Sequence, residues 1–222
     1  MSEFVRVAVA VTAKDLVSEW RSRELVWSLG QFIVLALVIA NFGFDVEASG
    51  ASRIAPGVLW LALVFAGLVA FGRAFAAERE QSSLEAMLLT SAPAAAIFAG
   101  KAAGAVLLLA VCEAVLLPGL ALFFGAPVVT VPVVATILLA TVGMAVLGCL
   151  LAALAAQTRA RELLLPVLVL PLWIPLVVVG GQAVRSALAV GQADGQALAL
   201  LLDFDILFVV VASLAARYVL DD

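Results

Sequence analysis

The chain has 222 residues, of which 66% are hydrophobic and only 13% are charged, and its formal net charge is −4. This composition excludes an ordinary soluble domain and indicates a polytopic membrane protein. No basic patch of the kind that binds nucleic acid is visible, so no nucleic-acid partner is expected.

Residues 1–23 predict an amphipathic helix that lies on the membrane surface. An apolar stripe recurs at helical spacing and consists of Val5, Val9, Ala13, Leu16 and Trp20. Lys14, Ser18 and Arg21 lie off this stripe, as an interfacial helix requires. The alternative is a frayed polar tail. We expect no removable signal peptide, because no apolar core is followed by a small-residue cleavage site.

Six apolar stretches are each long enough to cross about 30 Å of hydrocarbon. The expected spans are Leu25–Phe44, Ile54–Phe75, Ala96–Phe124, Val128–Ala156, Leu163–Gln182 and Ala197–Tyr218. Turn-rich or charged segments separate them, namely FDVEASGASR, residues 77–93, GAPVVTVP, QTRARE and AVRSALAVGQADG. The sequence therefore predicts one all-α transmembrane domain over residues 1–222, without a large soluble domain.

The positions of Lys and Arg predict the orientation, because positive residues near span ends stay in the cytoplasm. An inside N-terminus places most of them on the cytoplasmic side, namely Arg6, Lys14, Arg21, Arg23, Arg73, Arg79, Lys101, Arg159, Arg161 and Arg217. Only Arg53 and Arg185 then lie outside. We therefore expect both termini and residues 77–93 to be cytoplasmic.

Residues 77–93, AEREQSSLEAMLLTSAP, interrupt the apolar pattern with four charges in nine residues. Ser82 and Glu85 have the spacing of a capping box, which favours a short helix. Leu84, Met87 and Leu88 share one face of that helix. A charged amphipathic helix of this kind is suited to dock on a soluble partner. The alternative is a helix that only lies on the membrane.

Acidic residues inside the spans are candidates for a pathway or an interface, because an intramembrane carboxylate costs about 2.5–3.5 kcal/mol on insertion scales. Glu113 is mid-span and either lines a pathway or copy interface, or is a hydrogen-bonded structural residue. Asp203 and Asp205 point about 200° apart on a helix, so both cannot line one lumen. Asp203 is the candidate we retain, and we expect one of the two to reach the outer interface.

Three prolines interrupt the fifth span, Pro166, Pro171 and Pro175. Each removes a helical hydrogen bond and tends to kink the helix. The span is thus either a flexing element or a helix with a static kink.

The sequence has no histidine, so it predicts no His-based metal site and no imidazole ligand for haem. It has no P-loop, because the nearest stretch, GLVAFGRA, lacks the Lys and the Ser or Thr. Cys112 and Cys149 lie in different spans without a C-x-x-C pattern and are expected to be small core residues. We expect no catalytic residue and no cofactor bound by this chain.

The stretch EREQSSLEAMLLTSAP, followed by AIFAGK, resembles the coupling segment of ABC exporter permeases of the second type, with Glu85 as the acidic residue of its core. RIAPGVLW at 53–60 and LVLPLWIPLV at 168–177, together with the chain length, resemble the CcmB family, the B subunits of the haem exporter of bacterial cytochrome c maturation. This resemblance covers essentially the whole chain.

The resemblance implies a second-type ABC exporter permease half, with an N-terminal elbow helix at 1–23, six spans, and a coupling helix at 77–93 on the ATP-binding subunit CcmA. The coupling residues it implies are Glu78, Arg79, Glu80, Leu84, Glu85, Met87 and Leu88. ATP then binds to CcmA, and haem is a possible cargo.

The family context implies two copies of this chain in the bacterial cytoplasmic membrane, working with CcmC, CcmD and the haem chaperone CcmE. The cargo step is haem export or release of the haem-loaded chaperone. Two alternatives stay open: a mechanical assembly subunit that transports no haem itself, and a generic exporter half for another cargo.

Overall fold

The computed structural model describes residues 3–43, 51–74, 93–156, 158 and 161–220, and every regular element in these ranges is an α-helix. The helices are α1 Glu3–Ser22, α2 Glu24–Gly43, α3 Ala51–Ala74, α6 Ala94–Phe124, α7 Val131–Ala156, α8 Arg161–Val190 and α9 Gly195–Leu220. Six of them, all except α1, are long and apolar enough to cross a membrane. For the described residues, the predicted all-helical fold with six helices able to span a membrane is confirmed.

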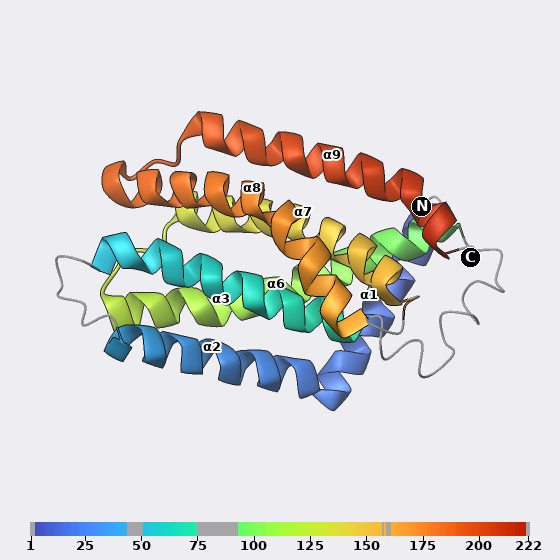
Figure 1. Cartoon of the computed structure of the whole chain (residues 1–222), viewed down its shortest axis with the longest axis horizontal. Helices are drawn as coiled ribbons and strands as arrows, with labels where there is room; N and C mark the ends of the chain where they lie inside the picture. Colours follow the sequence, from blue (N-terminus) through green and yellow to red (C-terminus); the bar gives the residue numbers. More distant parts are fainter. Residues whose placement is uncertain (1–2, 44–50, 75–92, 157, 159–160, 221–222) are drawn as a thin grey trace.

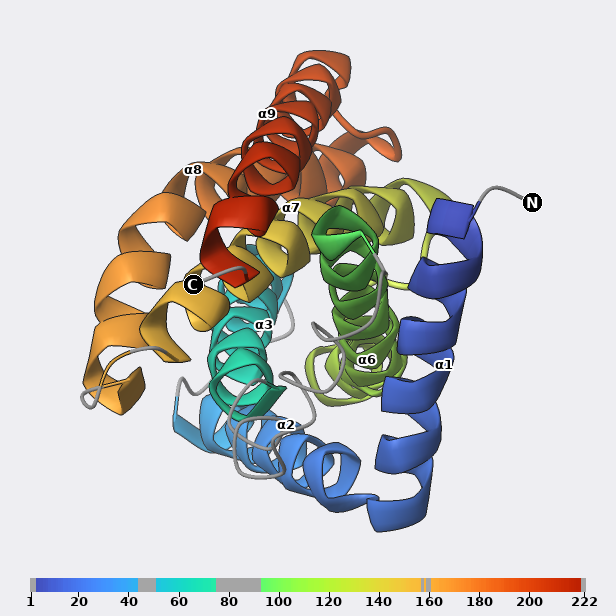
Figure 2. The same ribbon diagram turned by 90° about the vertical axis from the view of Figure 1, so that its right-hand side faces the viewer.

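The six long helices form a bundle in which consecutive helices run in alternating directions (Figure 1). α1 lies across one end of this bundle, which we call the α1 end, and in Figure 2 it runs across α6. α9 finishes at the same end, and α3 ends there before α6 begins there. α7 is the most enclosed of the six long helices. In its apolar 18-residue segment 78% of the residues are buried, against 22% in the corresponding segments of α2 and α9.

The turn between α1 and α2 is formed by Arg23, which has a left-handed backbone with φ 54. Its N–H donates to the carbonyl of Glu19 over 2.6 Å, which closes α1. The Glu19 carboxylate then accepts the N–H of Val26 at 3.0 Å and so caps the first turn of α2. This local chemistry fixes the change of direction between α1 and the first span.

The predicted span bounds hold to within a few residues except in the fifth span. The predicted end of that span at Gln182 and the predicted loop AVRSALAVGQADG are wrong, since α8 continues to Val190. Residues 183–190 are rich in the helix formers Ala and Leu and contain no Gly or Pro. Gly191, with φ 75, ends the helix, and its N–H donates to the Ala187 carbonyl.

Basic residues divide between the two ends of the bundle. Those in the described helices near the α1 end are Arg6, Lys14, Arg21, Arg73, Lys101, Arg161 and Arg217, and Arg23 lies there in the turn between α1 and α2. Arg53 and Arg185 belong to the opposite end. The two groups are those into which the sequence analysis divided these residues; which end faces the cytoplasm stays a prediction.

Candidate functional site

The seven predicted coupling residues, at 78–80, 84, 85, 87 and 88, lie outside the described residues. Their helix and their role therefore stay predictions. The flanking helices are described: α3 ends at Ala74 and α6 begins at Ala94, both at the α1 end. The described structure nearest to this segment along the chain includes the first turns of α6, where α1 is attached.

The contact between α1 and α6, which we call the α1–α6 junction, depends on a glycine. A Cβ added at Gly100 would lie 2.6 Å from the carbonyl oxygen of Ala8 and 2.7 Å from Cβ of Val11. Gly104, one turn later, faces Asp15. Small residues four apart allow two helices to approach this closely. The helix that packs against Gly100 and Gly104 is α1.

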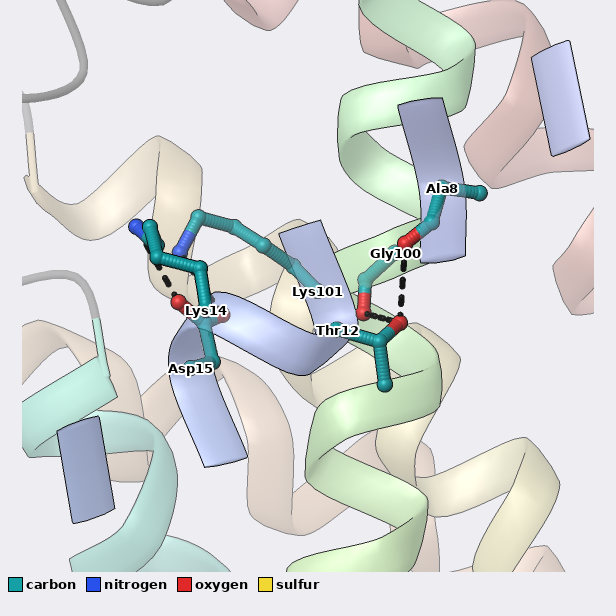
Figure 3. Close-up of polar contacts among 6 residues, drawn as sticks. All are labelled: Ala8, Thr12, Lys14, Asp15, Gly100 and Lys101. Carbon is teal, nitrogen blue, oxygen red and sulfur yellow. Dashed lines mark hydrogen bonds and ion pairs between the residues drawn. The ribbon is translucent and has the colours of Figure 1, made fainter. Parts of the chain in front are cut away.

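Polar side chains hold the α1–α6 junction together (Figure 3). The Thr12 hydroxyl donates to the Gly100 carbonyl across the junction at 2.8 Å, and lies 3.0 Å from the Ala8 carbonyl of its own helix. The Asp15 carboxylate pairs with Lys101 at 3.5 Å and with Lys14 at 3.1 Å. Lys101 is 5% exposed. A buried cation needs such a partner, so this pair fixes how α1 is positioned on α6.

The other face of α1 carries apolar side chains that the bundle does not cover. Val5, Val9 and Trp20 of the predicted stripe are exposed, Trp20 to 76%, whereas Val11 is the buried residue of this helix. α1 therefore has one face on α6 and an uncovered apolar face. This division suits a helix between protein and lipid, while its placement in the membrane interface stays a prediction.

A second close contact joins α3 to α8, and we call it the α3–α8 joint. A Cβ at Gly67 would lie 2.7 Å from Cη2 of Trp173, and a Cβ at Gly180 would lie 2.6 Å from Cη2 of Trp60. The Trp and Gly of each helix are seven residues apart, and the helices run antiparallel. Each tryptophan thus fills the space left by a glycine of the other helix. The stretches RIAPGVLW and LVLPLWIPLV supply the two tryptophans.

The three prolines of the fifth span all lie within α8, which stays helical through them and bends in both Figure 1 and Figure 2. Trp173 lies between Pro171 and Pro175. The structure thus puts this proline-rich region at the α3–α8 joint. Whether α8 flexes there stays a prediction.

The intramembrane acids occupy different environments. Glu113 is 3% exposed and accepts a hydrogen bond from the hydroxyl of Thr141 on α7. Asp205 is 5% exposed and lies against Gly143 of α7, whereas Asp203 faces outward. The expectation that the two aspartates point in different directions is confirmed. The intrachain bond of Glu113 favours the structural interpretation that the sequence left open.

Thr12 and Asp15 were not predicted from the sequence, because neither belongs to a motif and their partners on α6, Gly100 and Lys101, are far away along the chain. Cys112 and Cys149 are both buried, as expected of small core residues. Within the described ranges no three His, Cys, Asp or Glu side chains are grouped closely enough to hold a metal ion.

Comparison with known proteins identifies the family. The family model for the CcmB protein matches residues 6–221. The chain belongs to the CcmB family. Curated members similar to it are named "Heme exporter protein B": that of Paracoccus denitrificans is 32% identical over 71% of this chain and 73% of the relative. That of Bradyrhizobium diazoefficiens is 30% identical over 83% and 84%, and that of Rhodobacter capsulatus 29% over 77% and 78%.

CcmB-family membership and the six apolar helices together make this chain a multi-pass membrane protein. The match includes α1, residues 77–93 and all six spans, so the α1–α6 junction and the α3–α8 joint both lie within the family's extent.

Proposed function

We propose that this chain is the membrane-spanning permease subunit of an ABC transporter for cytochrome c biogenesis in the bacterial cytoplasmic membrane. It couples ATP hydrolysis by a partner subunit, CcmA, to haem export or to release of the haem-loaded chaperone CcmE. Family membership and six apolar helices support the permease assignment. The name of the relatives, "Heme exporter protein B", supports haem as the cargo.

The observation that carries the proposal is the α1–α6 junction. Residues 77–93 connect α3 to α6 at the α1 end, so a partner bound to them acts on the first turns of α6. Thr12 and the Asp15–Lys101 pair attach α1 to those turns. A push on residues 77–93 therefore displaces α1 and α6 as one unit. α3, on the other side of the segment, carries the same push to α8 through the α3–α8 joint.

The distribution of charge supports a cytoplasmic α1 end. Of the basic residues in the described ranges, eight lie near it and two near the opposite end, and basic residues near span ends stay in the cytoplasm. ATP is available on that side. The proposal thus places both termini, residues 77–93 and CcmA together.

Six spans are half of the usual permease core of an ABC exporter, so we propose two copies of this chain with two copies of CcmA. CcmC, CcmD and CcmE complete the set of proposed protein partners. ATP binds to CcmA, and this chain holds no cofactor of its own in the proposal.

A second candidate is a mechanical subunit that passes ATP-driven movement to its neighbours and carries no haem. The lack of any histidine in 222 residues favours it, because imidazole is a common axial ligand of haem iron. Haem retained on the chain purified without CcmC, CcmD and CcmE would count against this candidate. A generic exporter half predicts instead that deleting the gene leaves c-type cytochromes intact.

Glu113 offers a further distinction between the two candidates. A pathway role predicts that Glu113→Leu lowers cytochrome c yield while the chain still assembles. It also predicts that Glu113→Gln lowers the yield, because this variant removes the carboxylate although it keeps an acceptor for the Thr141 hydroxyl. A structural role predicts that Glu113→Gln retains full yield. An unchanged yield in Glu113→Leu would remove Glu113 from any pathway.

Co-purification with CcmA tests the main proposal. The chain is purified from cells that express the full set of partners, as wild type, Leu84→Asp and Glu85→Lys, and ATPase activity is measured on each preparation. Gln192→Lys adds a positive charge at the opposite end and is the control. We expect CcmA or its ATPase to be lost in the two segment variants alone, with normal insertion. Undiminished binding and activity would move the contact elsewhere.

A further inference from the structure

A groove lies between α2 and α3 near the opposite end of the bundle, and we call it the α2–α3 groove. Its volume is about 440 Å³, within the ~300–1,000 Å³ range of ligand pockets. It extends from Arg53 at the start of α3 to Phe65. Twelve residues of helix span about 18 Å, similar to half of the roughly 30 Å hydrocarbon core. The groove is therefore about as long as one lipid leaflet is deep.

Small side chains create the α2–α3 groove. Ala36 and Ala40 of α2 face Gly57 and Ala62 of α3 across it. A Cβ added at Gly57 would meet no atom within 4 Å, so this glycine does not serve close packing within the chain. At Gly100 and Gly67, by contrast, the missing side chain makes room for another helix. The space beside Gly57 is left for something outside the described residues.

The chemistry of the lining selects an amphipathic anion. Among the described residues, ten line the groove; nine of these are apolar, and Arg53 is the one that is charged. Arg53 is exposed and begins the apolar span, which places its guanidinium at headgroup level. Guanidinium binds phosphate oxygens in a bidentate manner. Phe32 and Phe65, with ring centroids 6.0 Å apart, lie farther along the groove.

We propose that the α2–α3 groove binds an anionic phospholipid, with one acyl chain between α2 and α3 and the headgroup phosphate on Arg53. Haem is also an amphipathic anion, but the described residues of the lining include no His, Cys, Met or Tyr to bind its iron. The lipid therefore fits the lining better than haem. This site is independent of the coupling role, and it gives a function to the RIAPG stretch that coupling does not use.

Native mass spectrometry of the purified full chain in detergent tests the site. The protein is titrated with phosphatidylglycerol and with phosphatidylcholine of the same acyl chains. We expect one phosphatidylglycerol to bind preferentially. Arg53→Gln removes the phosphate ligand and Gly57→Leu fills the groove, and each weakens this binding about tenfold. The matched controls are Arg185→Gln, an exposed arginine of the same end, and Gly30→Leu, a glycine of α2 with open space beside it.

Four results would overturn the proposal. Equal binding of the two lipids would mean that the groove does not recognise an anionic headgroup. An equal loss in Arg53→Gln and Arg185→Gln would mean a non-specific charge effect. If haemin displaces phosphatidylglycerol from the wild-type chain and the Arg53→Gln variant no longer binds haemin, the groove is a haem site. If Gly57→Leu changes the chain from dimer to monomer but leaves phosphatidylglycerol binding normal, the groove is an interface with a second copy of the chain. Elution volume and circular dichroism establish that each variant is folded.

Discussion

The α1–α6 junction and the α3–α8 joint solve the same packing problem with different chemistry. In both, glycine lets another helix approach to a distance that a Cβ would prevent. At the junction the space is taken by the α1 backbone and by Val11, and a hydroxyl and an ion pair hold the helices together. At the joint it is taken by Trp60 and Trp173, and Phe71 packs edge-on against Trp173 at 5.8 Å.

The difference follows from where each contact lies. The junction is near an end of the bundle, where polar groups can meet water or headgroups, so hydrogen bonds and charges can fix its geometry. The joint lies inside the spans, where van der Waals packing replaces the hydrophobic effect as the force between helices. Disturbing the joint should therefore mainly lower stability, and disturbing the junction should mainly change how α1 moves with α6.

The largest expected effect comes from Trp173→Ala, which empties the space beside Gly67. We expect a loss of about 3 kcal/mol in unfolding free energy, the lower end of the range for a buried tryptophan, because lipid reduces the transfer contribution. Thermal unfolding in detergent measures it. Trp20→Ala removes the same side chain from an exposed position of α1 and should change stability little. Equal losses in the two variants would contradict the joint.

A smaller effect is expected from Asp15→Asn, which removes the carboxylate that pairs with the buried Lys101 across the junction. Breaking this pair should cost about 2 kcal/mol, since Asp15 is partly exposed and its ion pair is thus weaker than a fully buried one. Lys14→Met removes only the exposed partner of Asp15 and should cost much less. Unfolding in denaturant compares them, and a larger loss in Lys14→Met would contradict the assigned roles.

The smallest effect is expected from Thr12→Val, which keeps the shape of the side chain and removes its hydroxyl. The lost hydrogen bond to the Gly100 carbonyl is worth about 1 kcal/mol. Protease accessibility of α1 measures its attachment to α6, and Ser18→Ala, an exposed hydroxyl of the same helix, is the control. If both variants leave α1 equally protected, the Thr12 bond does not contribute to the junction.

Periodicity and composition predicted the spans, because about twenty apolar residues per helix is a property of the sequence itself. The fifth span was ended too early because Gln182 and Arg185 are polar, although Ala and Leu continue the helix to Gly191. Spacing predicted that Asp203 and Asp205 diverge. Their neighbours could not be predicted: Asp205 is accommodated because Gly143 of another helix leaves room for it.

The contacts of the candidate site depend on partners far away in the sequence. Gly100 was recognisable as a close-packing residue, but nothing local pairs it with Thr12, 88 residues earlier. Likewise RIAPGVLW and LVLPLWIPLV resemble family motifs. Each tryptophan fills the space beside a glycine of the other helix, and this contact depends on the antiparallel register of α3 and α8, which the motifs do not reveal. The α2–α3 groove had no sequence signal beyond a glycine and an arginine near a span end.

Transmission of movement from residues 77–93 through the α1–α6 junction is tested most directly with Gly100→Leu, and Gly30→Leu is the matched control. CcmA binding, ATPase activity and cytochrome c yield are measured for both variants. We expect Gly100→Leu to insert, bind CcmA and support ATP hydrolysis, while its cytochrome c yield falls and Gly30→Leu remains normal. Equal, undiminished yields in the two variants would contradict it.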